Sequence, residues 1–366
     1  MFRFLKNSVL LLAIISVLLT STGIFGGAAA GSGLIGQELL EHAGLKQVWV
    51  QQLPLKKKET LEKLTIVDER VYALSSRNYM VSMNRQQGDV IFNKSFATVG
   101  LPIIGLDVYG DTLFSIVGNK LVEIDPDTGA EYKGQGITLG MTCPAARNNS
   151  FFYVGETDKR VHVLRADDKV QVFEVAPENE SMITSILADE KFVVFSTSKG
   201  DVICIKANQA TKVWTFKVSN TIIGPMVRSE DSLFFASEDT NVYRISGDSG
   251  QLIWKYQTEA ILNQSPRVTD NVVYQYVHGK GLTAIDKATG AFMWQLPGGV
   301  DLLAESNGKA YVITKSGLLV IIDNEKKKKL YSVNFGHVSR YVTNVTDSKI
   351  YIADKTGMVA CLKPVE

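Results

Sequence analysis

The sequence contains few residues of the kinds that build reactive or cross-linked sites. Its 366 residues include 3 cysteines, 4 histidines and 9 prolines, and the formal net charge is +1 at pH 7. This near-neutral balance gives no bulk electrostatic reason to expect binding to nucleic acid or to an anionic membrane. No two cysteines are adjacent, and three thiols do not supply a disulfide framework. We therefore expect a fold that is held together by packing.

Long apolar runs are also absent, except near the N-terminus. Positions 9–25 carry no charged residue, two basic residues precede them, and Ala28-Ala29-Ala30 follows. This pattern predicts a signal peptide over residues 1–30, with cleavage before Gly31. An uncleaved signal anchor is the alternative, because the run approaches the roughly 17 residues that a membrane span needs. Either segment predicts an exported protein, and no cysteine lies within or just after it to accept a lipid.

What the sequence does contain is a repeat. Large aromatic residues recur at steps of 40, 41, 41, 40, 40 and 37 residues, and each follows its own set of β-type runs. A period of about 40 residues is typical of the four-stranded blades of β-propellers. The recurring aromatics are Phe92, Tyr132, Phe173, Trp214, Trp254, Trp294 and Tyr331.

A turn motif precedes several of these aromatics. In Ile285-Asp286-Lys287-Ala288-Thr289-Gly290, the Asp side chain can accept hydrogen bonds from backbone amides further along the turn, and Gly supplies a positive φ. Related turns occur at 124–129 and 245–250. We assign purely structural roles, as turn formers and blade-packing aromatics, to Trp49, Asp125, Gly129, Trp214, Gly250, Trp254, Asp286, Gly290 and Trp294.

The number of blades follows from a mismatch between the two ends of the chain. Eight upstream β runs are followed by only seven aromatic ends, and the chain stops before an eighth. An unassigned strand around Trp49 lies one period before Phe92 and has its own aromatic residue. We therefore predict an all-β, eight-bladed propeller over residues 45–366, with four-stranded antiparallel blades. The N-terminal strand completes the last blade, which closes the ring and removes exposed sheet edges.

These blades resemble the pyrroloquinoline-quinone-type β-propeller repeat, and the likeness covers nearly all of the chain after the predicted targeting segment. That family includes quinoprotein alcohol and glucose dehydrogenases. It also includes a non-enzymatic, eight-bladed propeller subunit of the bacterial outer-membrane β-barrel assembly machinery. In size, blade number and export, this chain is similar to the second kind. The resemblance implies a scaffold of the periplasm or cell envelope, in contact with the membrane only through an uncleaved N-terminal segment.

The alternative function is a quinone- or small-ligand-binding propeller, catalytic or sensory. Such an enzyme needs Ca²⁺ ligands, a carboxylate base and loops that roof the cofactor. Connections such as 298–301 are too short for a roof, and the repeat already uses the tryptophans. The histidines, at positions 42, 162, 278 and 337, lack metal-ligand spacing and are expected in exposed loops. We predict no enzyme activity, no catalytic residue, no cofactor and no metal.

Two further segments bear on function. Residues 31–44 are predicted to be a tether, in which Leu34, Ile35, Leu39 and Leu40 could form one amphipathic turn of helix. Protein partners are expected to bind one face of the ring through its long inter-blade loops, and no nucleic acid is expected to bind. The predicted contact loops are 97–105, 137–143, 176–184 and 259–265, with Ile103, Met141, Met182 and Ile261 as exposed apolar residues.

Overall fold

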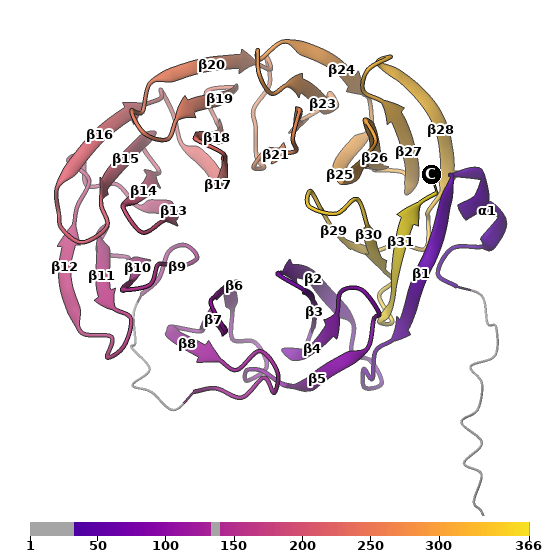
Figure 1. Ribbon diagram of the computed structural model, residues 1–366, viewed down its shortest axis with the longest axis horizontal. Coiled ribbons are helices and arrows are strands. Elements are labelled where there is room, and N and C mark those ends of the chain that lie inside the picture. Colours follow the sequence, from indigo (N-terminus) through magenta and orange to yellow (C-terminus); the bar gives the residue numbers. More distant parts are fainter. Residues whose placement is uncertain (1–32, 133–139, 366) are drawn as a thin grey trace, which may run out of the picture. The chain divides into compact units, whose positions relative to one another are not determined.

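The computed structural model describes residues 33–132 and 140–365, and nearly all of its regular structure is β-sheet. Its strands form eight antiparallel sheets arranged in a ring, so the predicted eight-bladed propeller is confirmed (Figure 1). Seven sheets have four strands, and the sheet of blade two has three described strands. The predicted fourth strand of blade two falls mostly on residues 133–139, which lie outside the described residues.

Each blade runs from an inner strand beside the ring axis to an outer strand at the rim (Figure 1). Blade one contains β2 (Leu61–Val67), β3 (Arg70–Ser75), β4 (Tyr79–Asn84) and β5 (Val90–Ser95). Blade two contains β6 (Ile103–Tyr109), β7 (Thr112–Val117) and β8 (Lys120–Ile124). Blade three contains β9 (Ala146–Arg147), β10 (Phe151–Gly155), β11 (Val161–Arg165) and β12 (Gln171–Val175). Blade four contains β13 (Ile183–Ala188), β14 (Phe192–Thr197), β15 (Asp201–Lys206) and β16 (Lys212–Lys217).

The second half of the ring repeats this order. Blade five contains β17 (Ile222–Ser229), β18 (Ser232–Ser237), β19 (Asn241–Ser246) and β20 (Leu252–Gln257). Blade six contains β21 (Arg267–Val268), β22 (Val272–Val277), β23 (Gly281–Asp286) and β24 (Phe292–Leu296). Blade seven contains β25 (Gly299–Ser306), β26 (Lys309–Thr314), β27 (Leu318–Asp323) and β28 (Lys328–Asn334). Blade eight contains β29 (Arg340–Val342), β30 (Ile350–Ala353), β31 (Met358–Pro364) and β1 (Leu45–Gln52).

The ring is closed by pairing between the two ends of the described chain. Strand β1 pairs antiparallel with β31, and Trp49 lies opposite Cys361. The Trp49 indole N–H donates a hydrogen bond to the carbonyl of Arg85 in blade one, at 3.2 Å. The Arg85 guanidinium in turn reaches Tyr351 Oη at 3.2 Å and Asp347 at 3.0 Å, both in blade eight. The predicted closure by the strand around Trp49 is therefore confirmed.

A short helix covers the rim beside this closure. Helix α1 (Gln37–His42) has no side-chain N-cap, and it contacts β1 and β28. Leu34, Ile35 and Leu40 are buried in a cluster with residues of blades seven and eight, whereas Leu39 is 37% exposed. The expected helical turn is present, and from Gly33 onward the chain belongs to one compact unit.

No helix of the described residues is long and apolar enough to cross a membrane.

Neighbouring blades are joined by a recurring contact between an aromatic side chain and a turn. Gly129, Gly250 and Gly290 have φ values of 66°, 70° and 73°. A Cβ atom at Gly129 or Gly290 would lie 2.6 or 2.8 Å from the ring of the preceding blade's aromatic residue, Phe92 or Trp254. The same contact joins Gly250 to Trp214, and Gly88 to Trp49. These turns therefore need glycine for their backbone conformation and because the aromatic ring lies against them.

Two of the aromatics expected to pack between blades lie at the surface instead. Tyr132 is 46% exposed and Tyr331 is 57% exposed. Tyr132 follows Gly129 by three residues, whereas Trp254 and Trp294 follow their glycines by four. A shift of one residue turns a strand side chain to the opposite face of its sheet. Tyr331 has the regular spacing, but blade eight takes its outer strand from the N-terminus and so lacks the turn that would cover the ring.

The outer strands share a feature that the sequence analysis missed. In seven blades, a β-bulge leaves one residue unpaired directly before the blade's aromatic position. A bulge increases twist and interrupts the edge hydrogen bonds, so it protects an outer strand from pairing with another chain. The bulged residues are all apolar: Val48, Ile91, Val172, Val213, Ile253, Met293 and Leu330.

The three cysteines have no role in cross-linking. Cys143, Cys204 and Cys361 are free and buried. Burial raises the pKa of the Cys143 thiol to about 11 and that of Cys361 to about 12. These thiols therefore stay protonated near neutral pH and act as small apolar side chains.

Candidate protein-binding surface

One face of the ring carries the connections between successive blades together with the turn between the two middle strands of each blade. We call this the loop face. Asn78, in such a turn of blade one, donates hydrogen bonds from Nδ2 to the carbonyls of Thr98 and Leu101, each at 2.9 Å. On the opposite side of the ring, Thr221 Oγ1 donates to the carbonyl of Ser198 at 3.0 Å. Hydrogen bonds thus fix connections of the loop face to neighbouring turns.

The loop face exposes isolated apolar side chains. Val99 and Leu101, in the connection between blades one and two, are 63% and 43% exposed. Ile261, in the connection between blades five and six, is 63% exposed, as predicted. Ile103, Met141 and Met182 are only partly exposed, contrary to expectation. Residues 137–139 of the second predicted contact loop lie outside the described residues.

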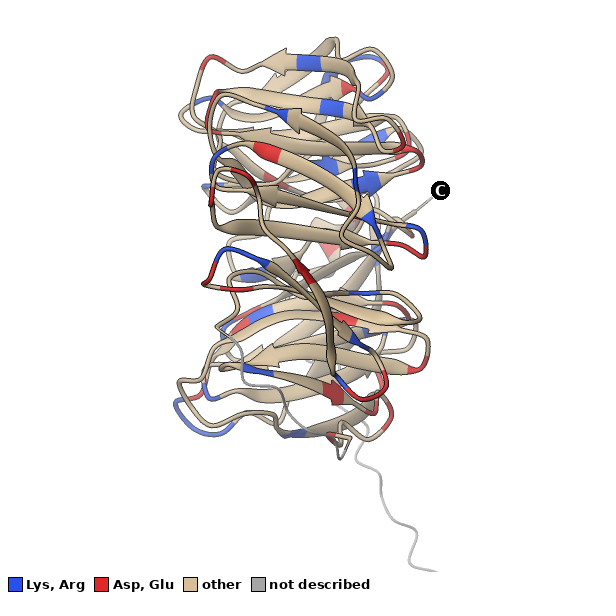
Figure 2. Ribbon diagram, turned by 90° about the vertical axis from the view of Figure 1, so that its left-hand side faces the viewer, with Lys and Arg blue, Asp and Glu red and all other residues tan. Residues whose placement is uncertain are grey.

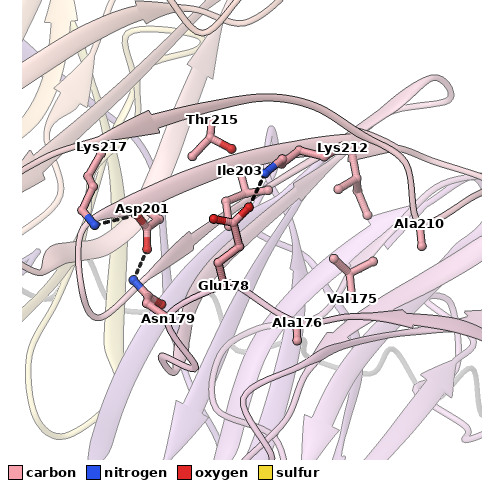
Figure 3. A pocket seen from close by; sticks show the side chains of 11 residues that line it. Val175, Ala176, Glu178, Asn179, Asp201, Ile203, Ala210, Lys212, Thr215 and Lys217 are labelled. Atoms are coloured by element: carbon pink, nitrogen blue, oxygen red, sulfur yellow. Dashed lines mark hydrogen bonds and ion pairs between the residues drawn. The ribbon is translucent and has the colours of Figure 1, made fainter.

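A groove of about 360 Å³ opens between blades three and four, next to the loop face (Figure 3). One wall is the end of β12 and the connection that follows, from Val175 to Asn179. The other wall and the floor come from β15, β16 and the turn between them. The apolar lining residues are Val175, Ala176, Ile203, Ile205 and Ala210.

Charged and polar side chains lie along the edge of this groove (Figure 3). Lys212 pairs with Glu178 across the opening, and this contact lowers the pKa of the Glu178 carboxyl. Asp201 accepts a hydrogen bond from Asn179 and lies 3.7 Å from the Lys217 ammonium. The groove therefore has an apolar floor and a rim of polar side chains that could pair with a ligand in place of one another. This is the usual composition of a peptide-binding or ligand-binding cleft.

The groove lies where the contact between aromatic and glycine is missing. Ala210 precedes Trp214 by four residues, as Gly250 precedes Trp254, so it occupies the glycine position of blade four. It does not have the positive φ of the glycines. Blade three presents Phe173 at its aromatic position, and this ring is only partly buried. The turn between β15 and β16 therefore lacks the glycine that lies against an aromatic ring at other interfaces, and the groove opens beside this turn.

The structure places the remaining residues of the predicted set in turns and blade contacts away from this groove. Asp125 Oδ1 accepts hydrogen bonds from the amides of Asp127 and Thr128, at 2.8 and 2.9 Å. Asp286 Oδ1 accepts from the Thr289 amide at 2.8 Å. The Trp254 indole donates to a carbonyl of the next blade's turn at 2.9 Å, and Trp294 donates to the Asn324 side chain at 2.8 Å. The structure thus ties these side chains to the scaffold.

One histidine differs from expectation. His162 lies on β11 and only 10% of its side chain is exposed, whereas His42, His278 and His337 are exposed as predicted. Its two ring nitrogens contact polar side chains of a turn and of β12. Among residues 33–132 and 140–365, no three His, Cys, Asp or Glu side chains are arranged to hold a metal ion.

Charged residues of both signs lie on the side of the ring that Figure 2 shows. Lysine, arginine, aspartate and glutamate occur at both ends of the strands (Figure 2). Lys56, Lys57 and Lys58 lie in the connection before β2, on the loop face, whereas Lys326 and Lys327 lie in the turn before β28. The two lysine runs are therefore at opposite ends of their blades and do not form one basic patch.

Comparison with known proteins agrees with this architecture. The model of the family described as "Outer membrane protein assembly factor BamB" matches residues 119–223 and 198–335. The outer membrane protein assembly factor BamB of Yersinia pestis is 21% identical over 232 residues, which cover 59% of this chain and 59% of that relative. The match thus spans about three fifths of the relative's length.

Two solved structures show the same fold. The crystal structure of BamB from Moraxella catarrhalis has a TM-score of 0.65 at 17% identity, and the match covers 87% of this chain and 97% of that one. The computationally designed protein Ika8 also has a TM-score of 0.65, at 14% identity, with 85% and 98% of the two chains covered. Because the family match spans more than half of its residues, this chain belongs to the family of the outer membrane protein assembly factor BamB.

Proposed function

We propose that this protein is a non-catalytic, exported propeller that acts as a protein-binding scaffold in the assembly of outer-membrane proteins. The Yersinia pestis relative is named an outer membrane protein assembly factor. The predicted export segment over residues 1–30 agrees with work in the periplasm or cell envelope. The role needs no cofactor, and its partners are proteins.

The main observation behind the proposal is that apolar side chains are exposed on loops, one of which is held in place by hydrogen bonds. Val99, Leu101 and Ile261 present apolar surface to solvent while hydrogen bonds hold the connection that carries the first two. A rigid surface binds a partner without a large ordering cost, and apolar contact contributes about 25 cal/mol per Å² buried. The groove between blades three and four adds a recess for a side chain of the partner.

Site-specific crosslinking tests the proposed contact surface. A photo-crosslinking amino acid is placed at Val99, Leu101 or Ile261 in cells that make the full chain. Val345 is the matched control, because it is 43% exposed like Leu101 but lies in a turn on the opposite face. We expect crosslinks to a component of outer-membrane protein assembly from the three loop-face positions and none from Val345. Equal crosslinking from both faces, or none from the loop face, contradicts the proposal.

A functional readout complements the crosslinks. The double variant V99D/I261D should lower the amount of assembled outer-membrane protein, because charged side chains weaken apolar contacts. Its melting temperature should stay near that of the unmodified protein, since both positions are more than half exposed. A saturable rise in melting temperature on adding pyrroloquinoline quinone with Ca²⁺ would instead support a cofactor-binding propeller.

A further inference from the structure

His162 is a nearly buried side chain at the centre of a polar cluster that connects two parts of blade three. Its Nε2 lies 2.9 Å from Asp158 Oδ2 and 3.7 Å from Glu156 Oε1, both in the turn between β10 and β11. Its Nδ1 lies 3.1 Å from Gln171 Oε1 and 3.7 Å from Glu174 Oε2, both on β12. The imidazole thus bridges the turn and the outer strand.

The hydrogen-bond pattern requires both ring nitrogens to be donors. Asp158 offers a carboxylate oxygen, which only accepts when ionised. The Gln171 amide nitrogen donates to Glu174 at 3.1 Å, so the amide oxygen is the atom that faces the imidazole. A neutral imidazole has one N–H and satisfies only one of these acceptors, whereas an imidazolium satisfies both.

The surrounding charges favour the same protonation state. Arg160 is the nearby cation, and it is already paired with Glu174 and lies 4.0 Å from Asp158. Glu156 Oε1 is buried and has no hydrogen-bond partner. Residues 140–142, which pair with this turn, and Val154, which lies opposite His162 on β10, bring no ionisable group. Three carboxylates therefore face one imidazole and one guanidinium.

We propose that His162 is a pH-dependent latch: as an imidazolium it ties the turn at residues 156–160 to strand β12, and as a neutral ring it releases one of these attachments. Val175, which follows Glu174, is part of the groove wall. Protonation of His162 therefore changes how stably the end of β12, one wall of the groove, is held in place. Its effect on partner binding rests on the proposed function, but the latch itself does not.

The pKa shifts of His162 and Glu156 determine how the stability of this cluster changes with pH. Burial alone lowers the pKa of His162, but the hydrogen bonds that the ring donates to Gln171 and Asp158 and the charge of Glu156 outweigh it, so the pKa is raised. The stabilisation is complete below the unfolded value of about 6.5 and is lost as the pH rises through the folded pKa. Burial also raises the pKa of Glu156, so this carboxyl likewise favours the folded state at lower pH.

A titration of His162 tests the latch without altering the cluster. The chain has 4 histidines, and replacing exposed His42, His278 and His337 with glutamine leaves His162 as the only imidazole. Its proton resonances then report one titration curve by NMR. We expect a midpoint above the ordinary value of about 6.5. A midpoint at or below that value overturns the proposal.

Hydrogen exchange tests the mechanical consequence. Peptides that cover residues 155–175 should lose protection between pH 6 and pH 8, after correction for intrinsic exchange. The loss should be about tenfold for each unit by which the pKa is raised. H162Q should show a clearly smaller loss of protection between the two pH values, because only Glu156 then contributes, and H278Q should behave like the unmodified protein. An equal pH response in H162Q overturns the latch, and the titration still decides the question if that variant does not fold.

Discussion

Replacing Trp49 with alanine tests whether the ring depends on its closing strand. The side chain is 8% exposed and packs with Tyr351, at a ring-centroid distance of 6.0 Å, and against Gly88 of blade one. Truncating a buried tryptophan costs about 3–5 kcal/mol. The lost hydrogen bond to the Arg85 carbonyl contributes about 1 kcal/mol of that amount. A loss of this size is a large part of the 5–15 kcal/mol that is typical of folded proteins.

Tyr331→Ala is the matched control for this prediction. Tyr331 occupies the same position in the repeat, but it is 57% exposed because no turn of blade eight covers it. Its truncation should cost less than about 1 kcal/mol, as surface changes usually do. Guanidinium unfolding followed by far-UV circular dichroism measures both variants without relying on tryptophan fluorescence.

The location of the damage distinguishes closure from general loss of packing. In W49A, amides of β1 and β31 should exchange faster than those of β22 and β23, because the two ends of the chain meet at the first pair. The reasoning is refuted if W49A and Y331A cost the same, or if W49A loosens all blades equally.

Three further predictions concern single interfaces. G250A should lose more stability than G279A. Both positions have positive φ, which costs roughly 1–2 kcal/mol for alanine, but only Gly250 lies against a tryptophan. Equal melting temperatures of the two variants would contradict the contact. Cys361, buried with its pKa raised to about 12, should react with a thiol reagent only under denaturing conditions, and prompt reaction of the folded protein at pH 8 contradicts its burial. The double variant F173W/A210G should create the contact seen between Trp214 and Gly250 and raise the melting temperature, with F173W alone as its control.

The periodic features of the fold could be predicted from the sequence. The constant spacing of aromatics gave the blade length, and the unmatched strand around Trp49 gave the closure and the number of blades. These features are local and repeat many times, so an error at one position does not change the result. The possible helical turn near Gln37–His42 was suggested by four closely spaced apolar residues, of which Leu39 and Leu40 lie in the helix and Leu34 and Ile35 precede it.

Features that depend on contacts between distant segments could not be predicted in the same way. His162 was expected to be exposed, because its partners on β12 are brought near by the pairing of two strands. Tyr132 has the residue type of a packing aromatic, but it follows Gly129 by three residues where the regular spacing is four. The bulges do have a signature in the sequence. In each bulged outer strand, the residue directly before the aromatic is apolar.

The groove shows how a repeat protein gains a distinct surface. At the interfaces of Trp49, Phe92, Trp214 and Trp254, an aromatic ring covers a glycine turn and fills the space between outer strands. If every interface between blades had this contact, all the interfaces would look alike from outside the ring. The interface between blades three and four departs from this rule, because Ala210 stands in place of the glycine and contributes to the lining of an open groove. We propose that an apolar side chain of a protein partner enters this groove, because its apolar lining and polar rim distinguish it from the interfaces that an aromatic ring fills.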